Sequence, residues 1–328
     1  MLPPLLARTV HNEEYEDLLS LWGDLESALS VLLARPMQAR SFQAKVRQLD
    51  QWLQDLVAHD IDASLYLMFQ LAATSHVGYS ASHALVCATL CHVMARELAL
   101  PRHERNALVR ASFTMNIGMT ALQDELAQQR EKPSAAQQEA IKSHSVRSQD
   151  LLEHLHITDD LWLEVVGQHH LTLGDRIPLA SMDAQDRLTR ILSAIDRYAA
   201  MISPRKSRLG RSATDSVRAL VGREMNQRDE VGYILVRSIG LCPPGTFVRL
   251  DNGDIAIVLR RSDKPNLPLV ASLLDHNGQA LSEPRLHRTS DGKPRVQSAL
   301  ARAAVTVEFD HRTMVRIGLY AAQPINHL

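Results

Sequence analysis

The sequence predicts a mainly α-helical protein, a helical bundle with an N-terminal helical extension and a small C-terminal β-rich unit. Apolar residues recur at helical spacing over most of the first 240 positions, and prolines interrupt them where helices would end. After Pro243 and Pro244 the pattern changes to alternation of apolar and polar residues. We therefore expect a helical region over 1–75, a helical domain over 76–240 and a β-rich domain over 241–328.

The N-terminal region carries two apolar stripes, each on one face of a predicted helix. The first consists of Leu18, Trp22, Leu25, Leu29 and Leu32, and the second of Phe42, Val46, Leu49, Leu53 and Leu56. Pro36 ends the first helix. Each stripe is too short to indicate a long coiled coil, so we expect it to pack against the next domain. A helical arm that forms a homodimer is the alternative.

Residues 76–237 read as further helices, including one from about 80 to 99, with breaks near Pro101, Pro133, residues 174–178 and Pro204. The β-rich unit begins with "GTFVRLDNGDIAIVLRR", in which Asn252 and Gly253 predict a hairpin turn. We expect two more strands in "PNLPLVASLLD" and "AAVTVEFD".

Composition narrows the class of protein. The 328 residues are 45% hydrophobic and 22% charged, as in ordinary soluble proteins, and the net charge of −1 argues against a nucleic-acid polymer as partner. No run of eighteen apolar residues suggests a membrane span, and the N-terminus turns acidic too early for a signal peptide. With three cysteines, we expect a cytoplasmic protein without a disulfide framework.

The sequence contains no glycine-rich phosphate loop and no GxSxG motif. The histidines are therefore the main candidates for functional residues. His83, Cys87 and Cys91 follow one another at i, i+4 and i+8 on a predicted helix, a spacing that would suit zinc. The favoured interpretation is that both cysteines are small buried hydrophobes, because the neighbouring residues are apolar.

Four histidines and one aspartate lie on apolar stretches of successive predicted helices: His83, His144, His169, His170 and Asp196. Each has a structural explanation, such as a hydrogen bond to a backbone carbonyl or an ion pair between Asp196 and a nearby arginine. Together they form a set of ligands suited to Fe, Mn or Zn. Because neighbours on a helix point about 100° apart, His169 and His170 cannot share one role.

This order of residues resembles the HD-GYP family of HD-domain phosphohydrolases, which hydrolyse cyclic di-GMP. The resemblance covers roughly residues 76–260. It includes "ASFTMNIGM", similar to the family's HDIGK stretch, "RKSR" at the family's RPYR, and "GLCPPGTFVRLDNGDIAIV" at its exit into a β segment. It implies a helical HD-type bundle in which the four histidines and Asp196 are metal ligands. The basic loop that follows Asp196 contains Arg205, Lys206 and Arg208, which could contact a phosphate or nucleotide. A solvated surface loop is the alternative, and charge runs usually favour it.

The chain departs from the family's motif inside the implied site. Met115 and Asn116 stand where the family has the histidine and aspartate that give it its name, and Met119 replaces a lysine. The family's acidic residue after the double histidine is Leu171, and the GYP segment has shrunk to "LGDRIP". Asn116 brings no charge to offset the repulsion between two metal ions about 3.5–4 Å apart. The cofactor is then none, or a single divalent ion (Fe, Mn or Zn).

Two functions remain in view. The first is a degenerate HD-GYP-like protein, a non-hydrolytic regulatory or interaction module in bacterial cyclic-di-GMP-type signalling. Such a module would have a protein partner or sense a cyclic dinucleotide. The second is a metal-dependent phosphodiesterase that acts on cyclic di-GMP or another phosphoester with one or two metals.

Overall fold

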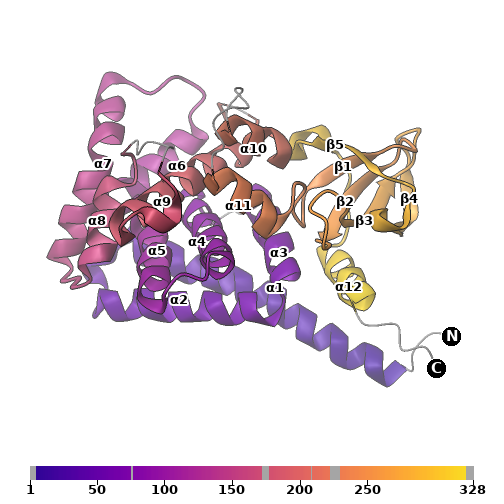
Figure 1. Cartoon of the computed structure of the whole chain (residues 1–328), viewed down its shortest axis with the longest axis horizontal. Helices are drawn as coiled ribbons and strands as arrows, with labels where there is room; N and C mark the ends of the chain where they lie inside the picture. Colours follow the sequence, from indigo (N-terminus) through magenta and orange to yellow (C-terminus); the bar gives the residue numbers. More distant parts are fainter. Residues whose placement is uncertain (1–4, 75–76, 172–176, 208, 222–229, 323–328) are drawn as a thin grey trace.

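The structure is a computed structural model that describes residues 5–74, 77–171, 177–207, 209–221 and 230–322. It is mainly helical, with one antiparallel sheet near the C-terminus, as the sequence predicts (Figure 1). The helices are α1 (Leu5–Ala34), α2 (Phe42–His59), α3 (Ile61–Thr74), α4 (Tyr79–Glu97), α5 (Arg102–Thr114), α6 (Thr120–Gln128), α7 (Ala135–His154), α8 (Asp160–Gln168), α9 (Ala184–Ile202), α10 (Ala213–Val221), α11 (Glu230–Ile239) and α12 (His311–Ala322).

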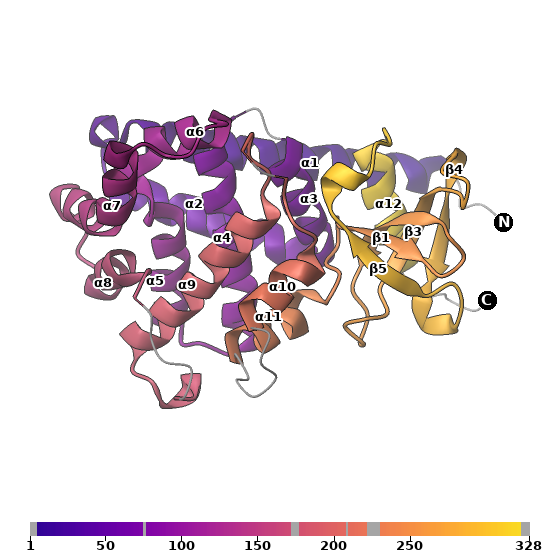
Figure 2. The same cartoon turned by 90° about the horizontal axis from the view of Figure 1, so that it is seen from above.

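Helix α4 is the centre of the helical bundle. Every side chain from Ser80 to Ala95 on this helix is buried, because its apolar residues continue around all sides rather than along one stripe. The helix packs against α1, α3, α5, α9 and α11, and Figure 2 shows these helices arranged around it. A residue on α4 can therefore meet side chains from several other helices.

The predicted apolar stripes of α1 and α2 face the bundle. Trp22, Leu25 and Leu29 of α1 and Leu53 of α2 are completely buried. Helix α1 contacts α4, and α2 contacts α5. Packing of these stripes against the next helices therefore agrees with the prediction.

Each of the three helices after α6, namely α7, α8 and α9, begins with a side-chain cap. Ser134 accepts a hydrogen bond from the N–H of Gln137 at the start of α7. Asp159 caps α8, and Asp183 caps α9 in the same way. Each cap satisfies a backbone N–H that has no partner within the helix, which is worth about 1 kcal/mol. These caps fix where α7, α8 and α9 start and so which of their residues face the neighbouring helices.

The sheet has the order β4-β3-β2-β1-β5. Its strands are β1 (Phe247–Leu250), β2 (Ile255–Arg260), β3 (Leu269–Leu274), β4 (Ala280–Arg288) and β5 (Val296–Leu300). The predicted hairpin at Asn252 and Gly253 joins β1 to β2, with Gly253 at a φ of 90° that favours glycine. The strand predicted in "PNLPLVASLLD" is β3.

The strand predicted in "AAVTVEFD", residues 303–310, is wrong. That segment contains a short 3-10 turn and extended chain outside the sheet, and it leads into α12. The two edge positions belong instead to β4 and β5, which the sequence analysis did not predict. Their residues are largely exposed or half-buried, so they lack the apolar alternation that marks a buried strand.

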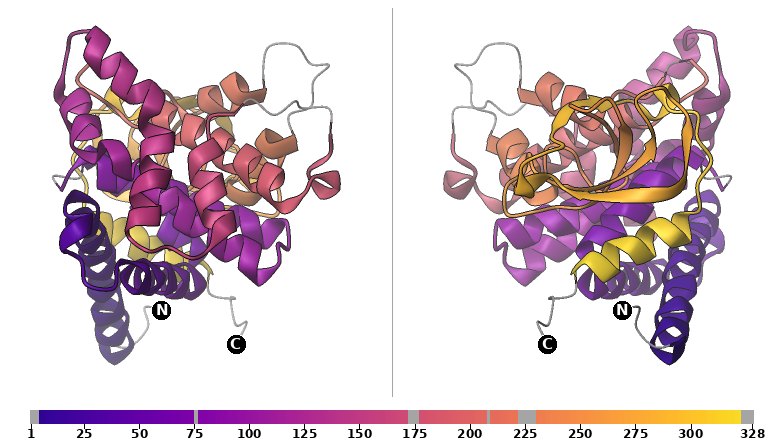
Figure 3. Two further views of the ribbon diagram at one scale, coloured as in Figure 1. Left: turned by 90° about the vertical axis from the view of Figure 1, so that its left-hand side faces the viewer. Right: turned by 90° about the vertical axis from the view of Figure 1, so that its right-hand side faces the viewer.

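The sheet is docked on the helical bundle through two adjacent arginines of β2 and its exit. Arg260 lies 2.7 Å from a carboxylate oxygen of Asp60, and Arg261 lies 2.6 Å from one of Asp62. Helix α12 then returns across the sheet to pack on α1 and α3 (Figure 3). The division at 75 and 240 stays a prediction, while these contacts show that the sheet and α3 pack directly together.

No helix in the described part of the chain is both long and apolar enough to cross a lipid bilayer.

Candidate metal centre

The first group of possible ligands joins α4 to α9. His83 and Cys87 lie one turn apart on α4, so both side chains point to the same neighbour. The Nε2 atom of His83 lies 2.8 Å from Oδ1 of Asp196, and the Sγ atom of Cys87 lies 3.6 Å from the same Nε2. All three ligand atoms lie within 4.8 Å of one another. His83 and Cys87 are buried, and the side chain of Asp196 is 15% exposed.

The second group joins α7 to the end of α8. His144 lies on α7, His169 directly follows α8, and His170 comes next. The Nε2 atom of His144 lies 3.2 Å from Nε2 of His169 and 3.3 Å from Nε2 of His170. His144 and His169 are buried, whereas His170 is exposed. The three ligand atoms form a compact set within 4.8 Å of one another.

Backbone hydrogen bonds fix which nitrogen of His144 and His169 carries hydrogen. The Nδ1 atom of His144 lies against the carbonyl of Ile141, and Nδ1 of His169 lies 2.7 Å from the carbonyl of Val166. A carbonyl only accepts, so both Nδ1 atoms carry hydrogen, and in the neutral rings both Nε2 atoms present lone pairs. Two lone pairs 3.2 Å apart repel unless a cation lies between them.

A metal ion suits this arrangement better than a proton. Burial lowers the pKa of His169 to about 3, with a smaller effect from His170, and burial also lowers the pKa of His144. Both rings are therefore neutral at pH 7. Two nitrogens bound to a tetrahedral zinc at about 2.0–2.1 Å lie about 3.3 Å apart, close to the observed separations. The Nδ1 bonds to carbonyls are also the usual support of metal-bound histidines.

The two groups are neighbours in one site. Burial opposes ionisation of Asp196, but the hydrogen bond from His83 and the electrostatic interactions with His83, His169 and His170 outweigh it. Together they lower the pKa of Asp196 below its usual range. Asp196 is therefore a carboxylate at pH 7 and faces both groups. The structure thus brings His83, His144, His169, His170 and Asp196 together.

Arg205 lies beside this centre through an aromatic contact. Its guanidinium carbon lies 4.6 Å from the centre of the Tyr79 ring, and its Nη2 donates to the Tyr79 hydroxyl at 2.8 Å. The Tyr79 ring in turn stacks on His83, with 5.6 Å between ring centres and 14° between planes. The guanidinium of Arg205 is therefore held near His83 by way of the Tyr79 ring. Lys206 is exposed, and Arg208 lies outside the described residues.

Met115 and Asn116, which the resemblance places at the family's HD motif, lie at the end of α5. Met115 is completely buried and belongs to the apolar core, while Asn116 is half-buried in the turn before the 3-10 helix η2 (Ile117–Met119). Neither residue belongs to the described groups of metal-ligating side chains. Leu171 is exposed, and most of "LGDRIP" lies outside the described residues.

Cys87 is the ligand candidate that the sequence analysis set aside as a buried hydrophobe. The i, i+4 spacing from His83 was the available signal, but the packing of apolar neighbours favoured the other interpretation. Cys91, one turn further along α4, is also completely buried but belongs to neither group, and its thiol interacts with Ser112. The two cysteines therefore differ in environment although they share a helix.

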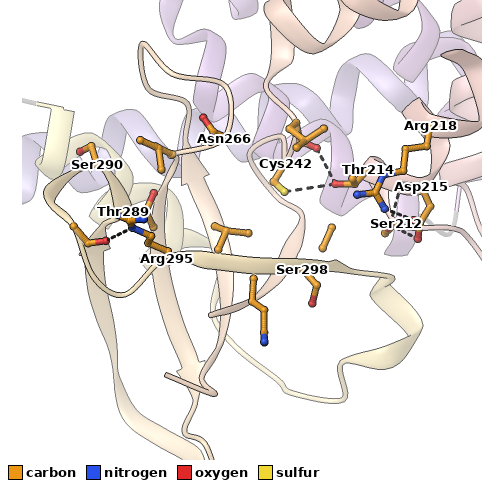
Figure 4. Close-up of a pocket in the computed structure, with 16 residues that line it drawn as sticks. Ser212, Thr214, Asp215, Arg218, Cys242, Asn266, Thr289, Ser290, Arg295 and Ser298 are labelled. Carbon is orange, nitrogen blue, oxygen red and sulfur yellow. Dashed lines mark hydrogen bonds and ion pairs between the residues drawn. The ribbon is translucent and has the colours of Figure 1, made fainter. Parts of the chain in front are cut away.

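A cavity of about 720 Å³ opens between α10 and the sheet (Figure 4). Its polar lining is largely paired internally. Thr289 donates to the carbonyl of Pro268, Thr214 to that of Leu241, and Asp215 lies between Ser212 and Arg218. The cavity contains neither group of metal-ligating side chains, so we place the functional site at the histidine centre.

Comparison with known proteins shows which family the chain belongs to. Residues 61–230 match the family model described as HD domain, which covers just over half of the chain. A cyclic di-GMP phosphodiesterase of Pseudomonas aeruginosa is 25% identical over 189 residues, which cover 56% of this chain and 45% of that protein. This chain therefore matches about half the length of that relative.

A protein of Bdellovibrio bacteriovorus described as an HDG"Y"P protein is among the solved structures similar to this chain. The similarity has a TM-score of 0.48 at 12% identity, over 65% of this chain and 68% of that one. The match to the family model identifies the chain: it belongs to the HD-domain family and is distantly related to the HD-GYP cyclic di-GMP phosphodiesterases.

Proposed function

We propose that this HD-domain protein binds a divalent metal at the histidine centre and acts as a non-hydrolytic regulatory module in bacterial cyclic-di-GMP-type signalling. The observation that carries the proposal is a mismatch within one site. The Nε2 atoms of His144, His169 and His170 converge as metal ligands would, while Asn116 stands where the family has a metal-bridging aspartate.

The charge of the site supports metal binding without two-metal hydrolysis. Metal-bound imidazoles are neutral. Asp196 is the one carboxylate in the two described groups of ligands, so it supplies their carboxylate charge. Two divalent ions about 3.5–4 Å apart repel strongly and need anionic bridging, which a neutral amide at position 116 does not provide. A single ion could still order α4, α7, α8 and α9 around itself, as structural metals do.

A regulatory module needs a surface for a partner, and α1 and the turn after it offer apolar side chains. Val31 is 70% exposed and Met37 is 65% exposed, beside a groove between α1 and α2 that contains Leu32, Leu49 and Trp52. A protein partner or a second copy of this chain would bury these residues. Light scattering gives the molar mass of the wild-type protein and of Val31→Glu, and so distinguishes the two occupants. A dimer in wild type that is lost in the variant supports the homodimer.

One observation favours a second candidate, a metal-dependent phosphodiesterase. Arg205 is held beside Tyr79 and His83, where a guanidinium could pair with a phosphate bound at the metal. A single metal could polarise a phosphoryl oxygen, but it would not stabilise both the attacking and the leaving oxygen as two metals do.

The deciding experiment combines metal content, ligand binding and hydrolysis on the same preparation. We expect tightly held Fe, Mn or Zn, binding of cyclic di-GMP in a calorimetric titration at tens of micromolar, and no turnover of it. Binding without turnover supports the regulatory module, and no heat at that concentration leaves a protein as the partner. Turnover by the wild-type protein supports the phosphodiesterase and contradicts our proposal.

The variant Asn116→Asp sharpens this comparison because it restores a carboxylate without changing size. A phosphodiesterase that is merely weak should gain at least about tenfold in rate with its bridging charge restored. A regulatory module should show no change, because other parts of the motif, such as Met115 and Met119, still differ. The exposed residue Asn277, in a turn of the sheet far along the chain, gives the control Asn277→Asp.

A further inference from the structure

We infer that Cys87 is a metal ligand, and that its thiolate binds a thiophilic divalent ion such as Zn²⁺ together with His83 and Asp196. The inference rests on the proposed metal centre and deepens it, because it identifies a sulfur donor in that centre and therefore the class of metal that it prefers.

The distances within this group match a coordination shell. A zinc ion about 2.3 Å from sulfur and about 2.0–2.1 Å from nitrogen, in tetrahedral geometry, separates the two donors by about 3.5 Å. The Sγ atom of Cys87 lies 3.6 Å from Nε2 of His83. The Oδ1 atom of Asp196 lies 2.8 Å from the same nitrogen, a hydrogen-bond distance that would widen to about 3.3 Å around a tetrahedral ion. All three donor atoms lie within 4.8 Å of one another.

Charge gives the second argument. Among these three side chains, only Asp196 supplies a formal negative charge, which leaves a divalent ion half neutralised. A thiolate at Cys87 adds a second negative charge from within the buried site. The two negative charges would neutralise a single divalent ion, and neither would bridge it to a second ion. Binding would displace one proton from the thiol to the solvent. It would also move the hydrogen that His83 donates to Asp196 from Nε2 to Nδ1, so that one metal–sulfur and one metal–nitrogen bond form.

Comparison with Cys91 indicates that burial alone does not account for the surroundings of Cys87. Both cysteines lie on α4, both are completely buried, and both are surrounded by the same apolar core. Only Cys87 belongs to a described group of metal-ligating side chains, whereas Cys91 interacts with Ser112. A small buried hydrophobe would serve equally at either position, so the pair provides a matched comparison within one helix.

Cobalt(II) reports directly on the ligand, because a cobalt–thiolate bond gives an intense charge-transfer band in the near ultraviolet. Metal-free wild-type protein, Cys87→Ser and Cys91→Ser should each be titrated with Co²⁺. We expect the band in wild type and in Cys91→Ser and its loss in Cys87→Ser. The affinity of Cys87→Ser for Zn²⁺ at this group should fall about 100-fold or more, since losing even a supporting residue typically costs about 10–100-fold.

The result separates this inference from the proposed function. Visible cobalt bands without the charge-transfer band, or a band that persists in Cys87→Ser, would overturn the role of Cys87 and leave a histidine metal centre intact. Failure of wild type to bind Co²⁺ or Zn²⁺ would overturn both. If Cys87→Ser does not fold, zinc X-ray absorption on the wild-type protein decides the matter: a sulfur neighbour at about 2.3 Å supports the inference, and a shell of nitrogen and oxygen alone contradicts it.

Discussion

His144 and His169 face each other through the same ring nitrogen, with 3.2 Å between their Nε2 atoms and both Nδ1 atoms directed at backbone carbonyls. The backbone thus selects the tautomer that turns two lone pairs toward one point. Such an arrangement is unfavourable in a metal-free core and favourable around a cation, which makes it the strongest structural sign of function in this chain.

Replacing His144 should therefore remove metal rather than only loosen the fold. The Nε2 atom of His144 lies 3.2 Å from that of His169 and 3.3 Å from that of His170. We expect His144→Ala to lower the affinity for Zn²⁺ by about 100-fold or more, measured by competition with a chromophoric chelator. His154 lies on the same helix and is exposed, so His154→Ala should bind like wild type. Equal affinity of the two variants would contradict the metal centre.

The stability of the metal-free protein should fall as the pH drops below about 6.5. Burial lowers the pKa of His92 to about 4, with smaller effects from Arg105 and Arg96. Between about pH 6.5 and 4 the unfolded chain binds a proton here that the folded chain does not. The free energy of unfolding then decreases by up to about 1.4 kcal/mol per pH unit from this group, and the loss is complete below its folded pKa.

Urea unfolding with a chelator present, at several pH values, measures this effect. His92→Gln removes the titrating ring and should make the pH dependence shallower by the contribution of that group. His103 is exposed, so His103→Gln should keep the wild-type slope. An unchanged slope in His92→Gln would show that His92 is protonated in the folded protein as readily as in the unfolded chain.

The contact between the sheet and α3 should depend on Asp62. Its carboxylate meets Arg261 at 2.6 Å and Arg260 at 3.4 Å, and its side chain is only 10% exposed. Asp62→Asn leaves two partly buried arginines with one carboxylate, so we expect a loss of about 2–3 kcal/mol in the free energy of unfolding.

An exposed ion pair gives the comparison. Glu97 lies 2.7 Å from Arg237, whose side chain is 66% exposed, so Glu97→Gln should cost less than about 1 kcal/mol. Urea midpoints of the two variants decide between these values. If Asp62→Asn costs no more than Glu97→Gln, the ion pairs do not hold the sheet in place.

Gly118 should be essential for the packing of η2 on α7, the helix that carries His144. A Cβ atom built on Gly118 would lie 2.9 Å from the backbone nitrogen of Ser148, closer than real Cβ contacts. Gly118 also donates its N–H to the Ser148 hydroxyl at 2.9 Å. We expect Gly118→Ala to cost about 1–3 kcal/mol, because backbone on α7 must move.

At Gly23, unlike Gly118, replacement by alanine should increase the stability of the protein. It lies in α1, and a Cβ atom there would meet nothing within 4 Å. Gly23→Ala should therefore stabilise the protein by about 0.5–1 kcal/mol, as expected for a glycine in a helix interior. Thermal unfolding of both variants tests the pair. A neutral Gly118→Ala would show that η2 and α7 can separate without cost.

Local patterns predicted those parts of the fold that depend on nearby residues. The stripe through Trp22, Leu25 and Leu29 predicted the buried face of α1. Gly253 predicted the hairpin, because the turn needs a positive φ that glycine adopts without strain. Strands β4 and β5 were not predicted because both lie at sheet edges, where side chains remain exposed. Their pairing with β3 and β1 depends on partners that local alternation does not reveal.

By itself the sequence determined the donors of the candidate site, since His83, His144, His169, His170 and Asp196 stand out as polar residues on apolar helices. Only the tertiary structure decided which atoms meet. His83 and Asp196 are 113 positions apart, and their contact depends on how α4 packs against α9. Cys87 illustrates the difference: its sequence context is that of a buried hydrophobe, as for Cys91, and the packing of α9 alone places a carboxylate beside one thiol and not the other.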